Sequence, residues 1–341
     1  MKSTIAIVAT LASIVVLGAT SSVQADTTIR LHTWASPKHL INSEILPAWK
    51  AAVEQATSGR VKVVISYPPK MPPPRIFDRV AAGIADASWS LHDYTPGRFR
   101  LSQIAELPFW NAMPSQLAMA HWRTHEKFFL EVNEHRGVKL LAFMSTNSGA
   151  LQTRFPFTAL ADLEGKKFRV GGGVAKEVAS RLGIVPVGAP APKVYSMLQQ
   201  GVVDGVFMPP ETAASFKLAE VTEQMTLMPE GLYYTSFYII LNQAKFDGMS
   251  KQDQDALMSV SGEVLIEASG TSWDKANSIG FAAAKKHDVN VVTPSAAIQS
   301  ELRARLGSIR DDWAAAADEK GVDGKAALAY FGAQIEASKG N

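Results

Sequence analysis

Strand-like and helical runs alternate along the chain almost from its beginning, and this alternation limits the fold more than any other feature. Residues 28–34, 60–67 and 87–91 are short strand-like runs of apolar or alternating residues. Between them, apolar residues recur at helical spacing in residues 40–56 and 76–84. Short strands separated by helices predict an α/β fold built on mostly parallel sheets.

The alternation continues through the middle of the chain and changes in its last third. The later strand-like runs are 138–145, 167–170, 186–187, 203–208, 237–242 and 289–292, and the later helical runs are 115–134, 160–163, 175–182, 193–200, 251–287, 296–320 and 324–336. Gly262, Gly270 and Gly280 interrupt the long helical run at points that allow kinks.

The N-terminus has the features of a secretory signal. Lys2 precedes an apolar run over residues 5–18, and Val23-Gln24-Ala25 places small residues at a cleavage site before Asp26. The run is short for a membrane span, although an uncleaved anchor is the competing interpretation. We therefore expect residues 1–25 to be a signal peptide and the mature chain to be exported.

Composition excludes several classes of protein. Hydrophobic residues make up 47% of the chain and charged residues 19%, which is typical of a globular protein. The net charge of +2 gives no reason to expect nucleic acid or an anionic membrane as a partner. The absence of cysteine excludes disulfides, thiol nucleophiles and thiolate metal sites.

Motifs for catalysis, cofactors and metals are weak. The sequence has neither a Gly-x-Ser-x-Gly nor a Walker motif, and Gly171-Gly172-Gly173 lacks the third glycine of a dinucleotide loop because Lys176 occupies its place. His121 and His125 have a spacing that can chelate a metal, but we expect them to be exposed helix residues. We predict no enzyme activity, no cofactor and no metal.

Arg169 is the strongest single candidate for binding. It ends the apolar run Phe168-Arg169-Val170 and is followed by glycines that let backbone or ligand approach closely. An arginine at such a place needs an anionic partner, and its planar fork matches a carboxylate. From the pattern alone, a structural salt bridge and a ligand clamp fit equally well.

Aromatic residues gather at the ends of predicted strands. They are Trp34, Trp89, Tyr94, Trp110, Tyr233, Tyr234 and Phe237. Ligands of parallel-sheet proteins collect at the carboxyl ends of strands, so part of this group is expected to line a pocket. Each aromatic taken singly is expected to pack in the core.

Several longer segments resemble one family. The most specific is residues 162–170, Asp-Leu-Glu-Gly-Lys-Lys-Phe-Arg-Val, and a second is residues 194–205, from Val-Tyr-Ser-Met through Gln-Gln-Gly-Val-Val-Asp-Gly. Residues 58–63, 94–99, 107–109 and 215–221 support them. In these segments the chain resembles the periplasmic receptors of tripartite ATP-independent periplasmic (TRAP) transporters, the DctP-like family.

The resemblance implies a two-lobed periplasmic-binding-protein-like fold. Each lobe is expected to hold a mostly parallel sheet flanked by helices, with crossing hinge strands and a long helix that spans both lobes. We expect residues 26–146 with 235–274 to form lobe I and residues 147–234 with 275–341 to form lobe II. Arg169 matches the family's signature arginine, which grips a ligand carboxylate, and the lobes are expected to close on the ligand and deliver it to a membrane permease.

Three departures from the family pattern bear on the ligand. The second arginine that many members carry falls near Gly149, with Arg154 present but out of register. Met208 stands where an asparagine is common, and Ala191 and Lys193 replace a bulky aromatic and a glutamate. Together they favour a monocarboxylate on an apolar body, because a second ionised group would be buried unpaired.

We therefore predict a periplasmic receptor for a small organic monocarboxylate, plausibly an aromatic or a keto or hydroxy acid. The expected apolar lining is Trp34, Trp89, Tyr94, Met208 and Phe237, and the expected polar contacts are His92, Asn147, Glu211 and Tyr234. The alternatives are a dicarboxylate receptor in which Arg154 is the second clamp, a sensor subunit and a periplasmic enzyme. We expect a monomer whose partners are the ligand and the permease subunits.

Overall fold

The computed structural model describes residues 27–339, so the predicted signal peptide lies outside the described residues. The strands are β1 (Thr27–His32), β2 (Val61–Ser66), β3 (Ala87–Leu91), β4 (Val138–Ser145), β5 (Ala150–Thr153), β6 (Lys167–Val170), β7 (Val185–Gly188), β8 (Gly205–Met208), β9 (Gln224–Thr226), β10 (Ser236–Asn242) and β11 (Asn290–Val292). Most match the predicted runs, whereas β5 and β9 had not been expected.

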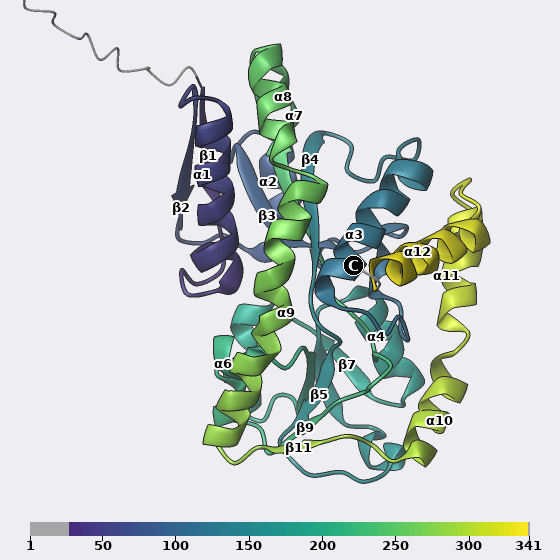
Figure 1. Cartoon of the computed structure of the whole chain (residues 1–341). Coiled ribbons are helices and arrows are strands. Elements are labelled where there is room, and N and C mark those ends of the chain that lie inside the picture. Colours follow the sequence, from purple (N-terminus) through teal and green to yellow (C-terminus); the bar gives the residue numbers. More distant parts are fainter. Residues whose placement is uncertain (1–26, 340–341) are drawn as a thin grey trace, which may run out of the picture.

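The strands form two sheets, which are stacked end to end in Figure 1. One has the order β2-β1-β3-β10-β4 and the other β11-β9-β5-β8-β6-β7. Each sheet is parallel except for one strand, which is β10 in the first and β5 in the second. The predicted fold class, two α/β units with mostly parallel sheets, is confirmed.

The chain crosses between the sheets at two neighbouring segments. One leads from β4 into β5 and the other from β9 into β10, so each antiparallel strand is the one that has just crossed over. The crossing segments pair through their backbones: Thr146 N donates to Thr235 O at 3.2 Å, and Gly149 N donates to Tyr233 O at 2.8 Å. A strand that arrives from the opposite sheet runs against its new neighbours, which explains the direction of both.

Helices cover the faces of both sheets. The α-helices are α1 (Leu46–Ala56), α2 (Ile76–Ala81), α3 (Pro114–Thr124), α4 (Gly173–Arg181), α5 (Val194–Gln199), α6 (Thr212–Ser215), α7 (Gln243–Asp247), α8 (Lys251–Ser259), α9 (Glu263–Lys286), α10 (Ala296–Leu306), α11 (Ile309–Asp318) and α12 (Gly324–Ser338). Short 3-10 or π turns are η1 (Ile41–Ile45), η2 (Pro73–Arg75), η3 (His92–Tyr94), η4 (Ser102–Glu106), η5 (His125–Phe129), η6 (Leu160–Leu163), η7 (Ala191–Lys193) and η8 (Leu218–Glu220).

Helix α9 runs along both sheets, as Figure 1 shows in green. Its 24 residues extend about 36 Å, at 1.5 Å per residue. Gly262, with φ +58°, separates α8 from α9. Gly270 and Gly280, where the sequence allows kinks, lie within the continuous helix α9. A Cβ on Gly270 would lie 2.5 Å from the Cβ of Ser115, and one on Gly280 would lie 2.0 Å from the carbonyl oxygen of Pro210. At these glycines α9 therefore packs closely against Ser115 of α3 and against Pro210, which follows β8.

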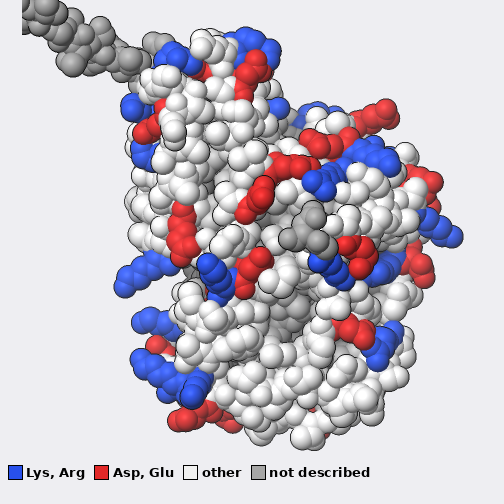
Figure 2. Space-filling view, in the orientation of Figure 1, with Lys and Arg blue, Asp and Glu red and all other residues white. Residues whose placement is uncertain are grey.

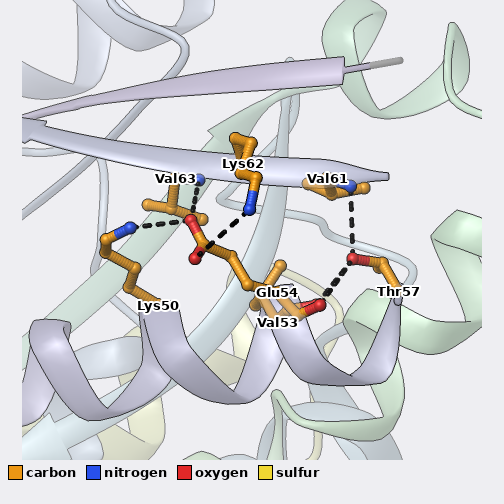
Figure 3. Close-up of polar contacts among 7 residues, drawn as sticks. All are labelled: Lys50, Val53, Glu54, Thr57, Val61, Lys62 and Val63. Carbon is orange, nitrogen blue, oxygen red and sulfur yellow. Dashed lines mark hydrogen bonds and ion pairs between the residues drawn. The ribbon is translucent and has the colours of Figure 1, made fainter. Parts of the chain in front are cut away.

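The edge strand β2 is joined to α1 by side chains at the end of that helix (Figure 3). The Glu54 carboxylate accepts from Lys50 Nζ at 2.7 Å and from Val63 N at 3.2 Å. Thr57 Oγ1 donates to Val53 O at 2.8 Å and accepts from Val61 N at 3.2 Å. The edge strand's outward amides are thus satisfied by the helix that covers it.

The C-terminal helices also link the two sheets. From β11 the chain passes through α10 and α11, and α12 packs on α3 beside the first sheet (Figure 1). The lobe boundaries remain a prediction. Leu101, Leu117 and Phe331 lie outside the second sheet but share one apolar core with residues of its strands, so this core extends beyond the second sheet.

On the face in Figure 2, basic side chains lie among acidic ones. No helix within residues 27–339 is long and apolar enough to cross a bilayer.

Four buried histidines, His92, His121, His125 and His135, cluster between α3 and the first sheet. The His121 ring stacks on Phe143 with centroids 3.9 Å apart. The expectation that His121 and His125 are exposed is wrong, because α3 and η5 turn them toward β4. Burial lowers the pKa of His125 to about 4, and it also lowers the pKa values of the other three well below the ordinary value of a histidine. Within residues 27–339 no group of side chains has metal-binding geometry.

We predict that His121→Phe stabilises the protein increasingly as pH falls. Neither ring nitrogen of His121 has a hydrogen-bond partner among the described residues, and burial keeps its pKa low. The unfolded chain accepts a proton there below about pH 6.5 and the folded chain does not, so each such histidine lowers the free energy of unfolding by about 1.4 kcal/mol per pH unit. Phenylalanine keeps the ring and removes this titration.

Urea unfolding of both proteins at about pH 8, 6 and 5 measures the effect. The stability difference should widen from the highest pH to the lowest. A difference that is the same at all three values contradicts the prediction.

Candidate functional site

A cavity lies between the two sheets, where strands from both end. It holds about 510 Å³ of space between atoms, part of it open to solvent. From the first sheet, the segments after β1 and β3 bring Trp34 and Tyr94 to it. From the second, β6 and β8 bring Arg169 and Met208. This is the position at the carboxyl ends of parallel strands where ligands of α/β proteins bind.

Six of the twelve predicted site residues line this cavity. They are Trp34, Tyr94, Arg169, Met208, Glu211 and Phe237. The cavity is also lined by residues that are not among the predicted ones, including Asp93, Phe207, Phe216 and Tyr233. Two signals were available: Tyr233 belonged to the aromatic group at strand ends, and Asp93 is the second residue after the predicted strand 87–91, next to the selected Tyr94.

The Arg169 guanidinium is buried and oriented by neutral groups. Its side chain is 3% exposed, its Nε donates to Ala189 O at 2.7 Å, and its NH2 donates to Tyr94 Oη at 3.3 Å. The Tyr94 hydroxyl also accepts from Ala191 N at 2.8 Å. Among the described residues no carboxylate forms an ion pair with Arg169. A buried cation of this kind requires a negative partner, which a ligand can supply.

Aromatic rings form a wall of the cavity. Trp34 and Phe237 line the cavity, and Trp89 lies behind both, with ring centroids 4.6 Å from Trp34 and 5.9 Å from Phe237. Trp273 of α9 stacks behind Phe237 at 5.5 Å. Trp34 Nε1 donates to Trp89 O at 3.0 Å, so its polar edge is turned away from the cavity. The wall therefore offers ring faces to a flat apolar ligand.

Two predicted residues are buried behind the wall and not in it. Trp89 is fully buried, and its Nε1 donates to Thr33 Oγ1 at 2.9 Å. His92 belongs to the histidine cluster, with its Nδ1 2.8 Å from Ser236 Oγ. Trp89 supports the lining, whereas His92 has no access to the cavity because η3 turns it inward and presents Asp93 and Tyr94 instead.

The other four predicted residues are also outside the cavity. Asn147 and Tyr234 line a separate hollow, and Asn147 Nδ2 donates to Trp273 O of α9 at 3.1 Å. Arg154 follows β5 at the end away from the crossing segment, is exposed, and places its guanidinium beside Gly201. An arginine that far along the strand does not reach the cavity in this conformation.

Gly149 has a steric role in the crossing segment. A Cβ at this position would lie 1.9 Å from Cε1 of Tyr233, so the tyrosine ring occupies the space that a side chain would need. Tyr233 is 3% exposed and lines the cavity. The place where many family members carry a second arginine is therefore filled by an aromatic ring from the other crossing segment.

Two of the three glycines after β6, Gly172 and Gly173, are required by Asp93. A Cβ on Gly172 would lie 2.6 Å from Asp93 O, and one on Gly173 would lie 1.7 Å from Asp93 Oδ1 and 2.9 Å from Glu106 Oε2. Gly171 to Gly173 thus form the tight strand-to-helix turn that the sequence suggested, with Asp93 packed against it. Burial raises the pKa of Glu106 well above its ordinary value, and the neighbouring Asp93 carboxyl adds to that shift.

Glu211 is the second acid at the cavity. Burial raises its pKa to about 7, although a hydrogen bond from Ser215 opposes the shift. The cavity is mainly apolar and is lined by one buried arginine and by the acids Asp93 and Glu211, so it can bind a small organic acid. Its described residues do not form a nucleophile with an adjacent base.

A cavity between two α/β units that are joined by crossing segments and one shared helix defines a solute-binding receptor. The chain belongs to the bacterial extracellular solute-binding protein family 7, whose DctP profile matches residues 31–316. It is a receptor of the TRAP type and not an enzyme.

Related proteins agree over nearly the whole length. A TRAP periplasmic solute-binding protein from Bordetella bronchiseptica, solved with (R)- and (S)-mandelate, is 37% identical, with a TM-score of 0.87 over 91% of this chain and 98% of its own. A marine metagenome receptor solved with 3-hydroxybenzoate is 27% identical, with a TM-score of 0.85 over 92% and 99%. TsaT of Comamonas testosteroni, an outer membrane transporter protein by name, is 27% identical over 92% and 93%.

We predict that Gly149→Ala destabilises the protein by about 1–3 kcal/mol, because the new methyl group collides with the Tyr233 ring. Gly188→Ala is the matched control, since a Cβ there meets no atom within 4 Å. Thermal unfolding of both variants measures the effect. Equal melting temperatures for the two would show that Tyr233 yields without cost.

Proposed function

We propose that this receptor binds an aromatic monocarboxylate in the cavity between its sheets, with Arg169 as the clamp for the carboxylate. The exported protein would then deliver its ligand to the membrane permease of a TRAP transporter. The observation that carries the proposal is the buried guanidinium of Arg169, which is held by Ala189 O and Tyr94 Oη and forms no direct ion pair with a carboxylate among the described residues.

The number of charged groups at the cavity favours one carboxylate over two. The Tyr233 ring leaves no room for a side chain at position 149, and Arg154 lies outside the cavity. Neither position 149 nor position 154 therefore supplies a second cation to the ligand. A second ligand carboxylate would face Asp93 and Glu211 and would be buried without a partner. The ligands solved with the two related receptors, mandelate and 3-hydroxybenzoate, are aromatic monocarboxylates.

Ring burial and the arginine both contribute to the binding free energy. Burying one aromatic ring of roughly 150–250 Å² at about 25 cal/mol/Å² offers about 4–6 kcal/mol before association costs. Micromolar affinity requires about 8 kcal/mol. Hydrogen bonds from a charged guanidinium, at about 1.5–3 kcal/mol each, help to fill the gap. We propose closure of the two lobes around the ligand as the event that removes it from water.

We predict that Arg169→Gln weakens binding of mandelate and 3-hydroxybenzoate at least about a hundredfold, because the ligand carboxylate loses its charged partner. Isothermal titration calorimetry measures the dissociation constants. Arg154→Gln is the matched control and should bind as the wild type does. Wild-type affinity in Arg169→Gln would refute the clamp.

A thermal-shift series tests the ligand class. Aromatic monocarboxylates should raise the melting temperature, whereas succinate and malate should not, because the cavity offers one cation. Stabilisation by succinate together with loss of that stabilisation in Arg154→Gln would instead establish the dicarboxylate alternative. Mass spectrometry of ligand released from freshly purified protein identifies what the receptor carries.

A further inference from the structure

We propose that Asp93 determines specificity in this cavity by accepting a hydrogen bond from a hydroxyl group on the carbon next to the ligand's carboxylate. The ligand class is then an aromatic 2-hydroxy acid. The inference rests on the proposed role of Arg169 as the carboxylate clamp.

Asp93 and Arg169 face the cavity side by side. Measured from the point that a Cβ on Gly171 would occupy, Asp93 Oδ2 lies 3.4 Å away and Arg169 NH2 lies 3.9 Å away, so the two atoms are at most about 7.3 Å apart. In a 2-hydroxy acid the hydroxyl oxygen and the nearer carboxylate oxygen are about 2.7 Å apart. With hydrogen bonds of about 2.8 Å at each end, such a ligand bridges the two residues.

A chain of buried hydrogen bonds fixes how Asp93 is protonated. Ser236 Oγ lies 2.8 Å from His92 Nδ1 and donates to Glu106 Oε1 at 2.6 Å. This bond makes Oε1 of Glu106 an acceptor. The other oxygen, Oε2, is directed with Asp93 Oδ1 toward Gly173, and no other group among the described residues donates to either atom. Two carboxyl oxygens can form a hydrogen bond only when one of them carries a proton.

Glu106 is the carboxyl that holds this proton. Glu106 is 0% exposed and Asp93 6% exposed. Burial raises the pKa of Asp93 too, but the hydrogen bond with Glu106 and the positive charge of Arg169 both oppose that shift. Burial and the adjacent Asp93 charge both raise the pKa of Glu106. Glu106 therefore donates to Asp93 Oδ1, and Asp93 presents an ionised Oδ2 to the cavity.

An ionised acceptor next to the clamp discriminates between ligands. A carboxylic acid without a nearby donor places its own charge near Asp93 and leaves Oδ2 desolvated, which opposes binding. A 2-hydroxy acid gives Oδ2 a charge-assisted hydrogen bond in the same place. Glu106 acts through Asp93 and is a positioning residue.

The experiment compares mandelate with phenylacetate, which differs only by lacking the 2-hydroxyl group. Calorimetric titration of the mature receptor should show mandelate binding about tenfold or more tightly. In Asp93→Asn the charge is lost, so mandelate should weaken and phenylacetate should hold or improve, bringing the ratio to within about threefold. In Glu106→Gln the amide still donates to Asp93, so the preference should remain.

Several results would overturn the inference. Equal affinities of the wild type for mandelate and phenylacetate would exclude a role for the hydroxyl group, and this comparison does not depend on whether a variant folds. An unchanged preference in Asp93→Asn, or its loss in a folded Glu106→Gln, would exclude the assigned protonation. Tighter binding of phenylglycine would identify an ammonium in place of a hydroxyl. Failure of the proposed function has a different signature, because neither acid would then bind or binding would survive Arg169→Gln.

Discussion

The buried charge of Arg169 is the constraint on which the rest of the site depends. A guanidinium that is 3% exposed is costly unless it is oriented and paired. The protein supplies the orientation through Ala189 O and Tyr94 Oη but leaves the pairing open. Arg169 thus makes the cavity favourable for an anion, and the rings of Trp34 and Phe237 give the same cavity an apolar lining.

The crossing segments set where this charge can act. They place the carboxyl ends of strands from both sheets around one cavity and pair with each other through Thr146, Gly149, Tyr233 and Thr235. Their side chains also shape the cavity, because Tyr233 both fills the space above Gly149 and lines the site. The connection between the two sheets and the shape of the cavity therefore depend on the same few residues.

Much of the fold could be predicted from the sequence, while only half of the site could. Periodicity identified most strands and helices and the long helix, but not β5 and β9, which are three or four residues long and carry little pattern. Position after a strand placed Trp34 and Tyr94 correctly. It could not separate His92 from Asp93, since successive residues of a short turn point in different directions and only packing determines which one faces the cavity.

The sequence by itself determined the α/β class, the family and the choice of Arg169 in β6 as the candidate binding residue. These depend on local periodicity and on motifs of neighbouring residues. Tertiary structure alone decided that Asp93 and Glu106 meet at Gly173, that Tyr233 closes the space at Gly149 and that four histidines lie in the core. Each of these contacts joins segments far apart in the chain. Their distances and burial, which set charge and protonation, exist only once both sheets have packed.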